Sequence, residues 1–174
     1  MNTIMNEWDD LSLKDKAKMV NFDVCIGKRD LNNETKDNSV ECKKLMAFVP
    51  DNPETYEHMK AIDYINFICD MYDVDTETRE INIKKYAKLF DMEDKLGDTI
   101  DSYSHGMKQK VVLISALAHD PRILIMDEPF VGLDPKAVFD LKKIMNEMVE
   151  DGKIIFFSTH ILDVAEKLCS RVAI

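Results

Sequence analysis

The chain has 174 residues, of which 45% are hydrophobic and 32% are charged, and its formal net charge is −10. This length and composition predict one globular domain, or a core with a small satellite lobe, and exclude a disordered or membrane-spanning chain. The acidic charge, without a visible basic patch, argues against a nucleic-acid partner, because phosphate binding requires clustered cations.

Two further patterns narrow the location and the chemistry. No apolar run is long enough to cross a bilayer and no secretory signal is visible, so we expect a cytoplasmic protein. The cysteines lack CxxC spacing, which argues against a zinc site or a disulfide framework and favours buried or idle thiols. They are Cys25, Cys42, Cys69 and Cys169.

The first part of the chain, residues 1–50, is predicted to contain strands and loops. A short polar amphipathic segment is followed by the strand-like FDVCI at 22–26, and a turn-rich polar loop at 32–39 leads into KKLMAFV at 43–49. The second part, residues 51–103, is predicted to be a small helical subdomain, because its apolar residues recur near the helical period.

The third part, residues 104–174, alternates between helical and strand patterns. Its unbroken apolar runs RILIM and KIIFF are typical of buried strands in a parallel sheet that is covered by helices on both faces. The expected fold class is therefore α/β, a parallel sheet with flanking helices plus the small helical subdomain. Helices are predicted at about 105–118, 136–150 and 161–169, and strands at 122–126, at 153–157 and from Arg171 onward.

Several polar residues follow directly after the two apolar runs. Asp127 and Glu128 follow the first run, and Ser158, Thr159 and His160 follow the second. Because ligands bind beyond the carboxyl ends of parallel strands, we expect these side chains to share one edge of the sheet. An anionic ligand at that edge of an acidic chain requires backbone N–H groups, a metal ion or a few local cations.

Four short motifs occur in a defined order: SYSHGMKQK at 102–110, ILIMDEP at 123–129, GLD at 132–134 and FFSTH at 156–160. Each alone is weak, since ILIMDEP is also typical of a buried strand followed by a solvated loop, and a lone histidine after a strand is usually structural. Together they resemble the signature motif, Walker B strand, D-loop and H-loop of an ATP-binding-cassette (ABC) ATPase. The resemblance covers about residues 22–174 and implies a P-loop-NTPase-like core.

The resemblance implies a site for ATP and Mg²⁺ at the strand ends. Asp127 matches the aspartate that holds the water shell of Mg²⁺, and Glu128 matches the general base that orients the water attacking the γ-phosphate. His160 matches the switch histidine, which donates a hydrogen bond toward the γ-phosphate. Asp134 matches the D-loop residue at the dimer interface, and Asp134 before Pro135 is also typical of a helix N-cap, so both roles are compatible.

The signature motif departs from the family's usual LSGGQ. Ser104 and Gly106 keep the hydroxyl and the permissive backbone that a phosphate contact at a helix start requires, whereas His105 and Met107 replace a glycine and a glutamine. The variant resembles that of export cassettes, so we do not interpret it as an inactive motif. The family resemblance implies a head-to-tail dimer in which Ser104, His105, Gly106 and Met107 contact ATP held by the second subunit. Asp51 stands where the family has its Q-loop glutamine, and an acid there is able to ligand Mg²⁺ or its water.

The sequence contains no P-loop, GxxxxGK[ST], the motif whose backbone N–H groups and lysine hold the ATP phosphates. Only Gly27 and Gly152 precede a lysine, and neither has the other residues of the motif. We therefore expect a cassette that lacks its nucleotide-gripping start and is trimmed at its end. We also expect the isolated chain to bind ATP very weakly or not at all.

The resemblance implies an ATP-binding subunit of a bacterial ABC transporter that couples ATP binding and hydrolysis to export. Its implied partners are a second ABC ATPase subunit, in a head-to-tail dimer, and a transmembrane permease subunit at the inner face of the cell membrane. The alternative is a degenerate or truncated cassette that acts as a non-hydrolytic regulatory or structural subunit. The lack of a heptad pattern argues against a DNA-maintenance cassette, and the lack of repeats argues against a tandem translation-type cassette.

Overall fold

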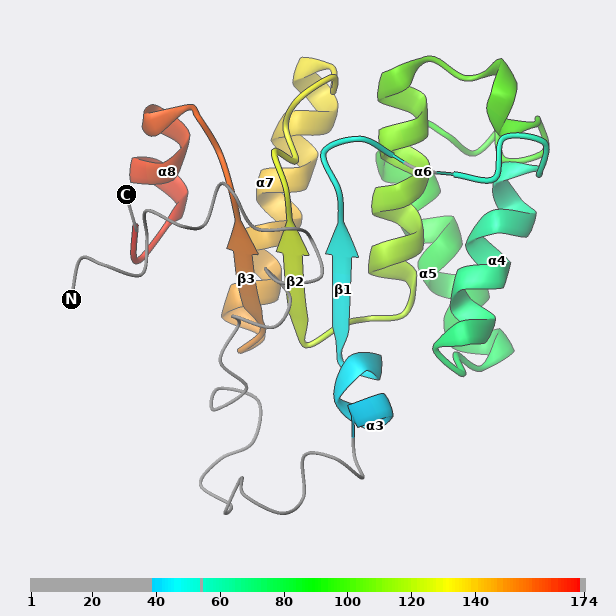
Figure 1. Ribbon diagram of the computed structural model, residues 1–174, viewed down its shortest axis with the longest axis horizontal. Helices are drawn as coiled ribbons and strands as arrows, with labels where there is room; N and C mark the ends of the chain where they lie inside the picture. The colour runs from blue at the N-terminus through cyan, green and yellow to red at the C-terminus, as the bar shows by residue number, and fades with distance from the viewer. Residues whose placement is uncertain (1–38, 54, 173–174) are drawn as a thin grey trace.

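The computed structural model describes residues 39–53 and 55–172. The predictions of an amphipathic segment near the start, of a strand at 22–26 and of most of the loop at 32–39 lie outside the described residues. Figure 1 shows a central sheet with one group of helices beside its β1 edge and another helix behind it.

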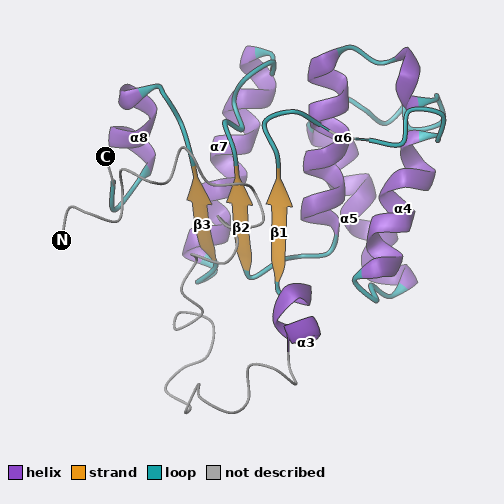
Figure 2. Ribbon diagram, in the orientation of Figure 1, coloured by secondary structure: helices purple, strands orange, loops and turns teal. Residues whose placement is uncertain are grey.

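Three parallel strands form this sheet, in the order β1 (Met46–Val49), β2 (Ile123–Met126) and β3 (Ile154–Phe157). Val49 lies opposite Met126, and Met126 lies opposite Phe157, so the three strands end at the same level. All the strands point in one direction (Figure 2), and their carboxyl ends therefore share one edge. The predicted parallel sheet is confirmed.

The helices predicted near 105–118, 136–150 and 161–169 are confirmed to within about two residues, the usual uncertainty of helix ends. No helix among the described residues is both long and apolar enough to cross a membrane. The helices are α3 (Ser39–Lys44), α4 (Ala61–Met71), α5 (Thr76–Leu89), α6 (His105–Ala118), α7 (Pro135–Glu150) and α8 (Leu162–Leu168), with a 3₁₀ turn, η3 (Ile100–Ser102).

The starts of α6 and α7 are set by side chains that accept hydrogen bonds from otherwise unsatisfied backbone N–H groups. Ser104 accepts from Met107 at 3.3 Å, and Asp134 accepts from Ala137 at 2.9 Å. Pro135 occupies the first turn of α7, where its missing N–H costs nothing. The helix N-cap predicted at Asp134 is therefore confirmed.

Helix α6 lies at the centre of the hydrophobic core. Its residues 111–118 are all buried. It packs against α4 and α5 on one side and against β1 on the other. Because one buried helix contacts both groups, it fixes the position of the α4–α5 pair relative to the sheet.

The two faces of the sheet differ in how well they are covered. Ala47 and Leu124 lie side by side on one face and belong to the core that α6 and α7 complete. On the opposite face, Phe48 is 43% exposed and Phe156 is 44% exposed. Within the described residues, the prediction of helices on both faces therefore holds for one face, and the other face is only partly covered.

Two local expectations differ from the structure. The helix α3 forms at Ser39–Lys44, where a loop leading into a strand was expected. The strand predicted from Arg171 is not formed at Arg171 or Val172, which are exposed and pair with no described strand. That prediction is wrong as far as residue 172, because a strand requires a neighbour for its backbone groups and an apolar pattern does not supply one.

The central position of α6 generates a stability prediction. We expect Ile114→Ala to lower the free energy of unfolding by about 2–5 kcal/mol, because this side chain is 0% exposed and its removal leaves a cavity. As a matched control, Ile81→Ala on α5, where the side chain is 59% exposed, should change it by less than about 0.5 kcal/mol. Urea denaturation measures both values, and equal losses would contradict the assignment of α6 to the core.

Candidate functional site

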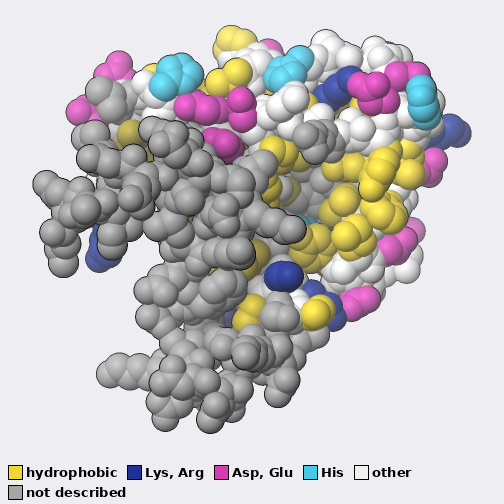
Figure 3. Space-filling view, in the orientation of Figure 1, with side chains coloured by type: hydrophobic (Ala, Val, Ile, Leu, Met, Phe, Trp, Pro, Cys, Tyr) yellow, Lys and Arg dark blue, Asp and Glu magenta, His cyan; other side chains and the backbone are white. Residues whose placement is uncertain are grey.

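The carboxyl ends of the strands and the starts of α6 and α7 lie at one edge of the molecule (Figure 1). In the space-filling view, acidic side chains and histidines gather along this edge (Figure 3). The chain segments that carry the predicted site residues therefore meet there, as the strand-end positions had indicated.

Ser158 holds the two acids that follow β2. Its hydroxyl donates to Asp127 Oδ1 at 2.5 Å and accepts from the backbone N–H of Glu128 at 3.0 Å. The backbone N–H of Asp127 in turn donates to the carbonyl of Val49 at 2.9 Å, which continues the pairing of β1 and β2 beyond the strands. Asp127 is thus fixed from both neighbouring strands.

Glu128 adopts the left-handed backbone conformation, with φ of 44°. This conformation costs free energy in a residue other than glycine, and such residues are concentrated at functional sites. The side chain of Glu128 is 23% exposed, and its Oε1 lies 3.1 Å from Nδ1 of His160, whose side chain is 70% exposed. The two residues assigned to catalysis by resemblance are therefore in direct contact.

The position of Asp127 suits a hydrated magnesium ion. Mg²⁺ usually keeps several waters and is held through one or two carboxylates together with substrate phosphates. Asp127 offers a half-buried carboxylate that Ser158 already orients. Asp51 is exposed just beyond the end of the neighbouring strand β1. In the described part of the chain, no group of three or more His, Cys, Asp or Glu side chains forms a metal cage.

The start of α6 lies directly against the loop at 131–134. A Cβ atom on Gly106 would lie 2.4 Å from the carbonyl oxygen of Gly132, and one on Gly132 would lie 2.6 Å from the ring of His105. Gly132 also has φ of +76°, which disfavours any other residue. The glycine at 106 therefore has a packing role that its motif position alone did not indicate.

Asp134 joins the start of α7 to α6. One of its carboxylate oxygens caps α7, and the other lies 2.6 Å from Nζ of Lys110. The hydrogen bond from Lys110, followed by that from the Ala137 backbone, lowers the pKa of Asp134 below its ordinary value. Asp134 and helix α6 are thus bonded within one chain.

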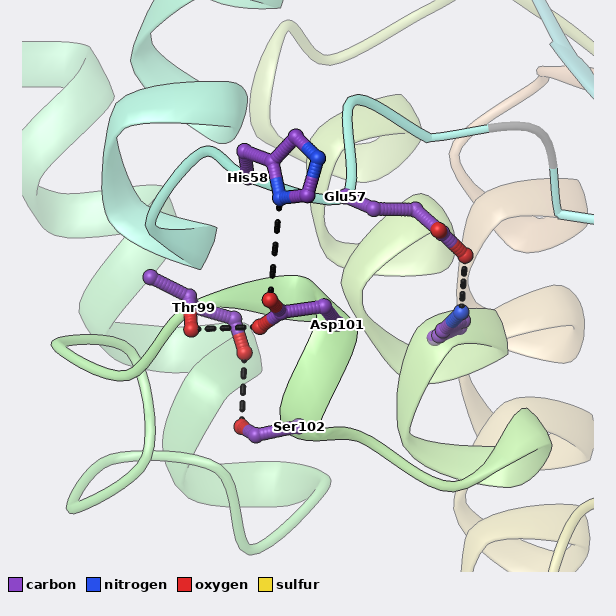
Figure 4. A network of polar contacts seen from close by, with 6 residues as sticks. Glu57, His58, Thr99, Asp101 and Ser102 are labelled. Carbon is purple, nitrogen blue, oxygen red and sulfur yellow. Dashed lines mark hydrogen bonds and ion pairs between the residues drawn. The ribbon is translucent and has the colours of Figure 1, made fainter.

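A second polar network ties the segment before α4 to the region around the start of α6 (Figure 4). Lys108 Nζ lies 2.6 Å from Glu57 Oε1, and His58 Nδ1 lies 3.7 Å from Asp101 Oδ2. The hydrogen bond from Lys108 lowers the pKa of Glu57. Because Glu57 and His58 are exposed, these contacts add little stability and act mainly to orient the two segments.

The structure distributes the predicted residues in three places along the edge. Ser158 was predicted to lie at this edge, but its bonds to Asp127 and Glu128 were not predicted. Lys108 and Lys110 were not predicted to belong to the site, because their acid partners are distant in sequence. Met107 is partly buried and packs against the core. Asp51, Asp127, Glu128 and His160 lie beyond the strand ends, Ser104, His105, Gly106 and Met107 at the start of α6, and Asp134 at the start of α7.

The parallel sheet with its flanking helices defines the class of the protein, an α/β fold with a P-loop-NTPase-like core. A solved structure of an ATP-binding subunit of an ABC transporter is 32% identical, with a TM-score of 0.74, over 78% of this chain and 56% of that one. The structure of cbiO1 from Clostridium perfringens, part of the ABC transporter complex cbiONQ, has the same fold, at 21% identity and a TM-score of 0.61, over 77% of this chain and 54% of that one.

The sequence comparisons give the family. The ABC transporter family model matches residues 16–131. The ABC-type transporter ATP-binding protein EcsA of Bacillus subtilis is 34% identical over 149 residues, which are 85% of this chain and 60% of EcsA. The chain belongs to the ABC transporter family, and it spans little more than half the length of these similar proteins.

The close approach at Gly106 generates a second prediction. We expect Gly106→Ala to lower the free energy of unfolding by about 1–3 kcal/mol, because the added Cβ would lie 2.4 Å from a backbone oxygen, so that the backbone has to shift. The matched control is Gly97→Ala, since a Cβ there meets nothing within 4 Å. Urea denaturation compares the variants, and an unchanged stability of Gly106→Ala would contradict the contact.

The Glu57–Lys108 pair generates a pH prediction. We expect Lys108→Ala to raise the pKa of Glu57 toward its ordinary value, measured by NMR titration of the carboxyl carbon. Because the folded-state pKa is lowered, the stabilisation by this pair is present above the ordinary value of 4.5 and is lost as the pH falls through the folded-state pKa. The pKa of Asp134, which Lys110 lowers, serves as the control and should not change.

Proposed function

We propose that this chain carries the Walker B, D-loop, signature and H-loop parts of an ATP-binding subunit that couples ATP binding and hydrolysis to export. The proposal rests chiefly on the contact of His160 with Glu128. Ser158 bonds both Glu128 and the neighbouring Asp127 and so orients the two acids. A carboxylate that is fixed at a strand end beside a histidine suits a site that positions a water against a phosphate.

Each residue of the proposed site has a distinct role. Glu128 is the general base that orients and polarises the attacking water, and His160 donates a hydrogen bond toward the γ-phosphate. Asp127, together with Asp51 beyond the end of the neighbouring strand, would hold Mg²⁺ through its water shell, and the ion would neutralise phosphate charge. The half-buried position of Asp127 supports this role, because a rigid carboxylate keeps a constant distance from the phosphates.

We propose that the start of α6 contacts a second ABC ATPase subunit in a head-to-tail dimer. Ser104, His105, Gly106 and Met107 would contact the ATP held by that subunit, and Asp134 would lie at the same interface. Ser104 and His105 are exposed at the N-terminal end of a long helix, which favours anion binding through its free N–H groups.

The exposed apolar residues of the helical subdomain, 51–103, support a permease subunit as a further partner. Tyr56 is 60% exposed, Phe67 is 40% exposed and Met71 is 61% exposed. The rings of Tyr56 and Phe67 pack edge to face with their centroids 5.8 Å apart. Clustered exposed apolar residues mark interaction surfaces, and docking here would place the chain on the cytoplasmic face of a membrane.

The second candidate function is a non-hydrolytic regulatory or structural subunit. The observation in its favour is the lack of a GxxxxGK[ST] motif in the sequence. If no other segment of the protein supplied a phosphate-binding loop, Glu128 and His160 would have no ATP of their own to act on, whereas Ser104 and Gly106 would remain able to complete the site of a partner.

Titration with Mg-ATP tests whether the chain holds nucleotide itself or only completes the site of a second subunit. We expect no saturable binding to the purified chain up to about 1 mM nucleotide, because the backbone N–H groups and the lysine of a P-loop supply most of the binding free energy for ATP. We also expect Mg-ATP to induce association with an ABC ATPase subunit of the same genome that has its own P-loop, measured by analytical ultracentrifugation.

Two variants make the association test specific. Ser104→Asp keeps a good helix cap but adds a negative charge beside the phosphates, so association should weaken at least about tenfold. Glu128→Gln should leave association unchanged, because Glu128 is proposed to act only on ATP bound by its own subunit. Micromolar ATP binding by the chain alone would overturn the expectation that the chain does not bind nucleotide. If Mg-ATP did not change the association of the two subunits, that result would contradict the proposed dimer.

A further inference from the structure

Two lysines in the first turns of α6 reach two different parts of the molecule. Lys108 pairs with Glu57 in the segment before α4, and Lys110 pairs with Asp134 in the loop before α7. Between them, Gln109 is fully buried, and its Nε2 donates to the carbonyl of Pro50 at 3.5 Å, at the end of β1. Three consecutive side chains thus connect the start of α6 to three separate segments.

The connection through Lys110 is the tightest of these, because a second contact reinforces it. The backbone of Gly106 lies against the carbonyl of Gly132, and the ring of His105 lies against the Cα of Gly132. Two residues further along, the carboxylate of Asp134 bonds both Lys110 and the start of α7. The start of α6 and the loop at 131–134 are therefore held at both ends of their contact.

The surroundings of Lys110 distinguish its ion pair from an ordinary surface pair. The side chain of Lys110 is only 13% exposed, whereas that of Lys136, which pairs with Asp91, is 59% exposed. Because Lys110 is shielded, solvent and salt weaken its attraction to Asp134 less than they weaken that of an exposed pair. The position of a shielded side chain is also better defined. The pair is therefore suited to transmitting the position of one motif to the other.

We propose that Lys110 is a positioning residue that couples the signature motif to the D-loop within one subunit. Through Asp134 it holds residues 104–107 and 131–134 in a fixed position relative to each other, so that both segments contact the second subunit together. This inference rests on the proposed function for its role in the dimer, but the coupling itself is a property of the isolated chain.

Amide hydrogen exchange of the free chain, followed by NMR without nucleotide, tests the coupling. The reporters are the N–H of Met107, bonded to Ser104, and the N–H of Ala137, bonded to Asp134. We expect Lys110→Ala to accelerate exchange at both reporters by about three- to fivefold, the size expected for the loss of a partly exposed ion pair. Lys110→Arg should restore both rates.

A matched control is available at the opposite edge of the sheet. Lys153 pairs with Asp120, with side chains 19% and 60% exposed, which is close to the 13% and 48% of Lys110 and Asp134. Lys153→Ala removes a similar ion pair without touching either motif, so both reporters should keep their wild-type rates. Acceleration by this variant as well would show a general loss of stability and overturn the proposal.

Asp134→Asn tests the same ion pair through its acidic partner. Asparagine keeps the capping oxygen but loses the charge that Lys110 binds, so exchange at Met107 should still rise. The double variant Lys110→Ala, Asp134→Asn should exchange no faster at Met107 than either single variant, because both remove one interaction. Additive effects, or an effect of Lys110→Ala on Ala137 alone, would overturn the coupling.

The dimer role is measured separately. In the Mg-ATP association experiment, Lys110→Ala should weaken association at least about threefold, and Lys110→Arg and Lys153→Ala should match the wild type. If the wild-type chain does not associate, the proposed function fails while the exchange data still decide the coupling. If it associates and Lys110→Ala associates equally well, the positioning role is overturned.

Discussion

Parallel pairing of the three strands is the constraint on which the rest of this structure depends. The pairing does not stop where the strands end, because the backbone N–H of Asp127 bonds Val49 and that of Ser158 bonds Met126. The residues just past each strand are therefore held by the sheet itself and not by flexible loops. This rigidity lets Ser158, which follows β3, orient the acids that follow β2. The hydrogen bond that Ser158 accepts from the N–H of Glu128 offsets part of the strain in the backbone of that residue.

Helix α6 adds the second constraint, since one element serves both the core and the site. Its buried length fixes the direction and rotation of the helix axis. The polar residues of its first turns must then point in set directions, and Lys108 and Lys110 find acids on either side. A change in the packing of α4 and α5 against α6 would therefore reach the start of α6, where the motif that resembles the family's signature lies.

Close packing and phosphate binding both favour a glycine at position 106, at the start of α6. A glycine at 106 suits the approach of a phosphate to a helix start, and it is also the only residue that fits against Gly132. The conformation of the Gly-Leu-Asp turn and the position of residues 104–107 are consequently linked in one chain. For a member of the ABC transporter family, such a link joins two motifs that are proposed to face the same partner subunit.

Local patterns in the sequence determined the helices α6, α7 and α8, the strands β2 and β3 and the helix cap at Asp134, because periodicity, capping and proline placement act within a few residues. They also placed Asp127 and Glu128 at a strand end and predicted that His160 shares their edge. The tertiary structure alone decided that His160 contacts Glu128, that Lys110 bonds Asp134 and that one sheet face stays partly open. These features depend on strand register and on the packing of segments distant in the chain, and no local pattern encodes either.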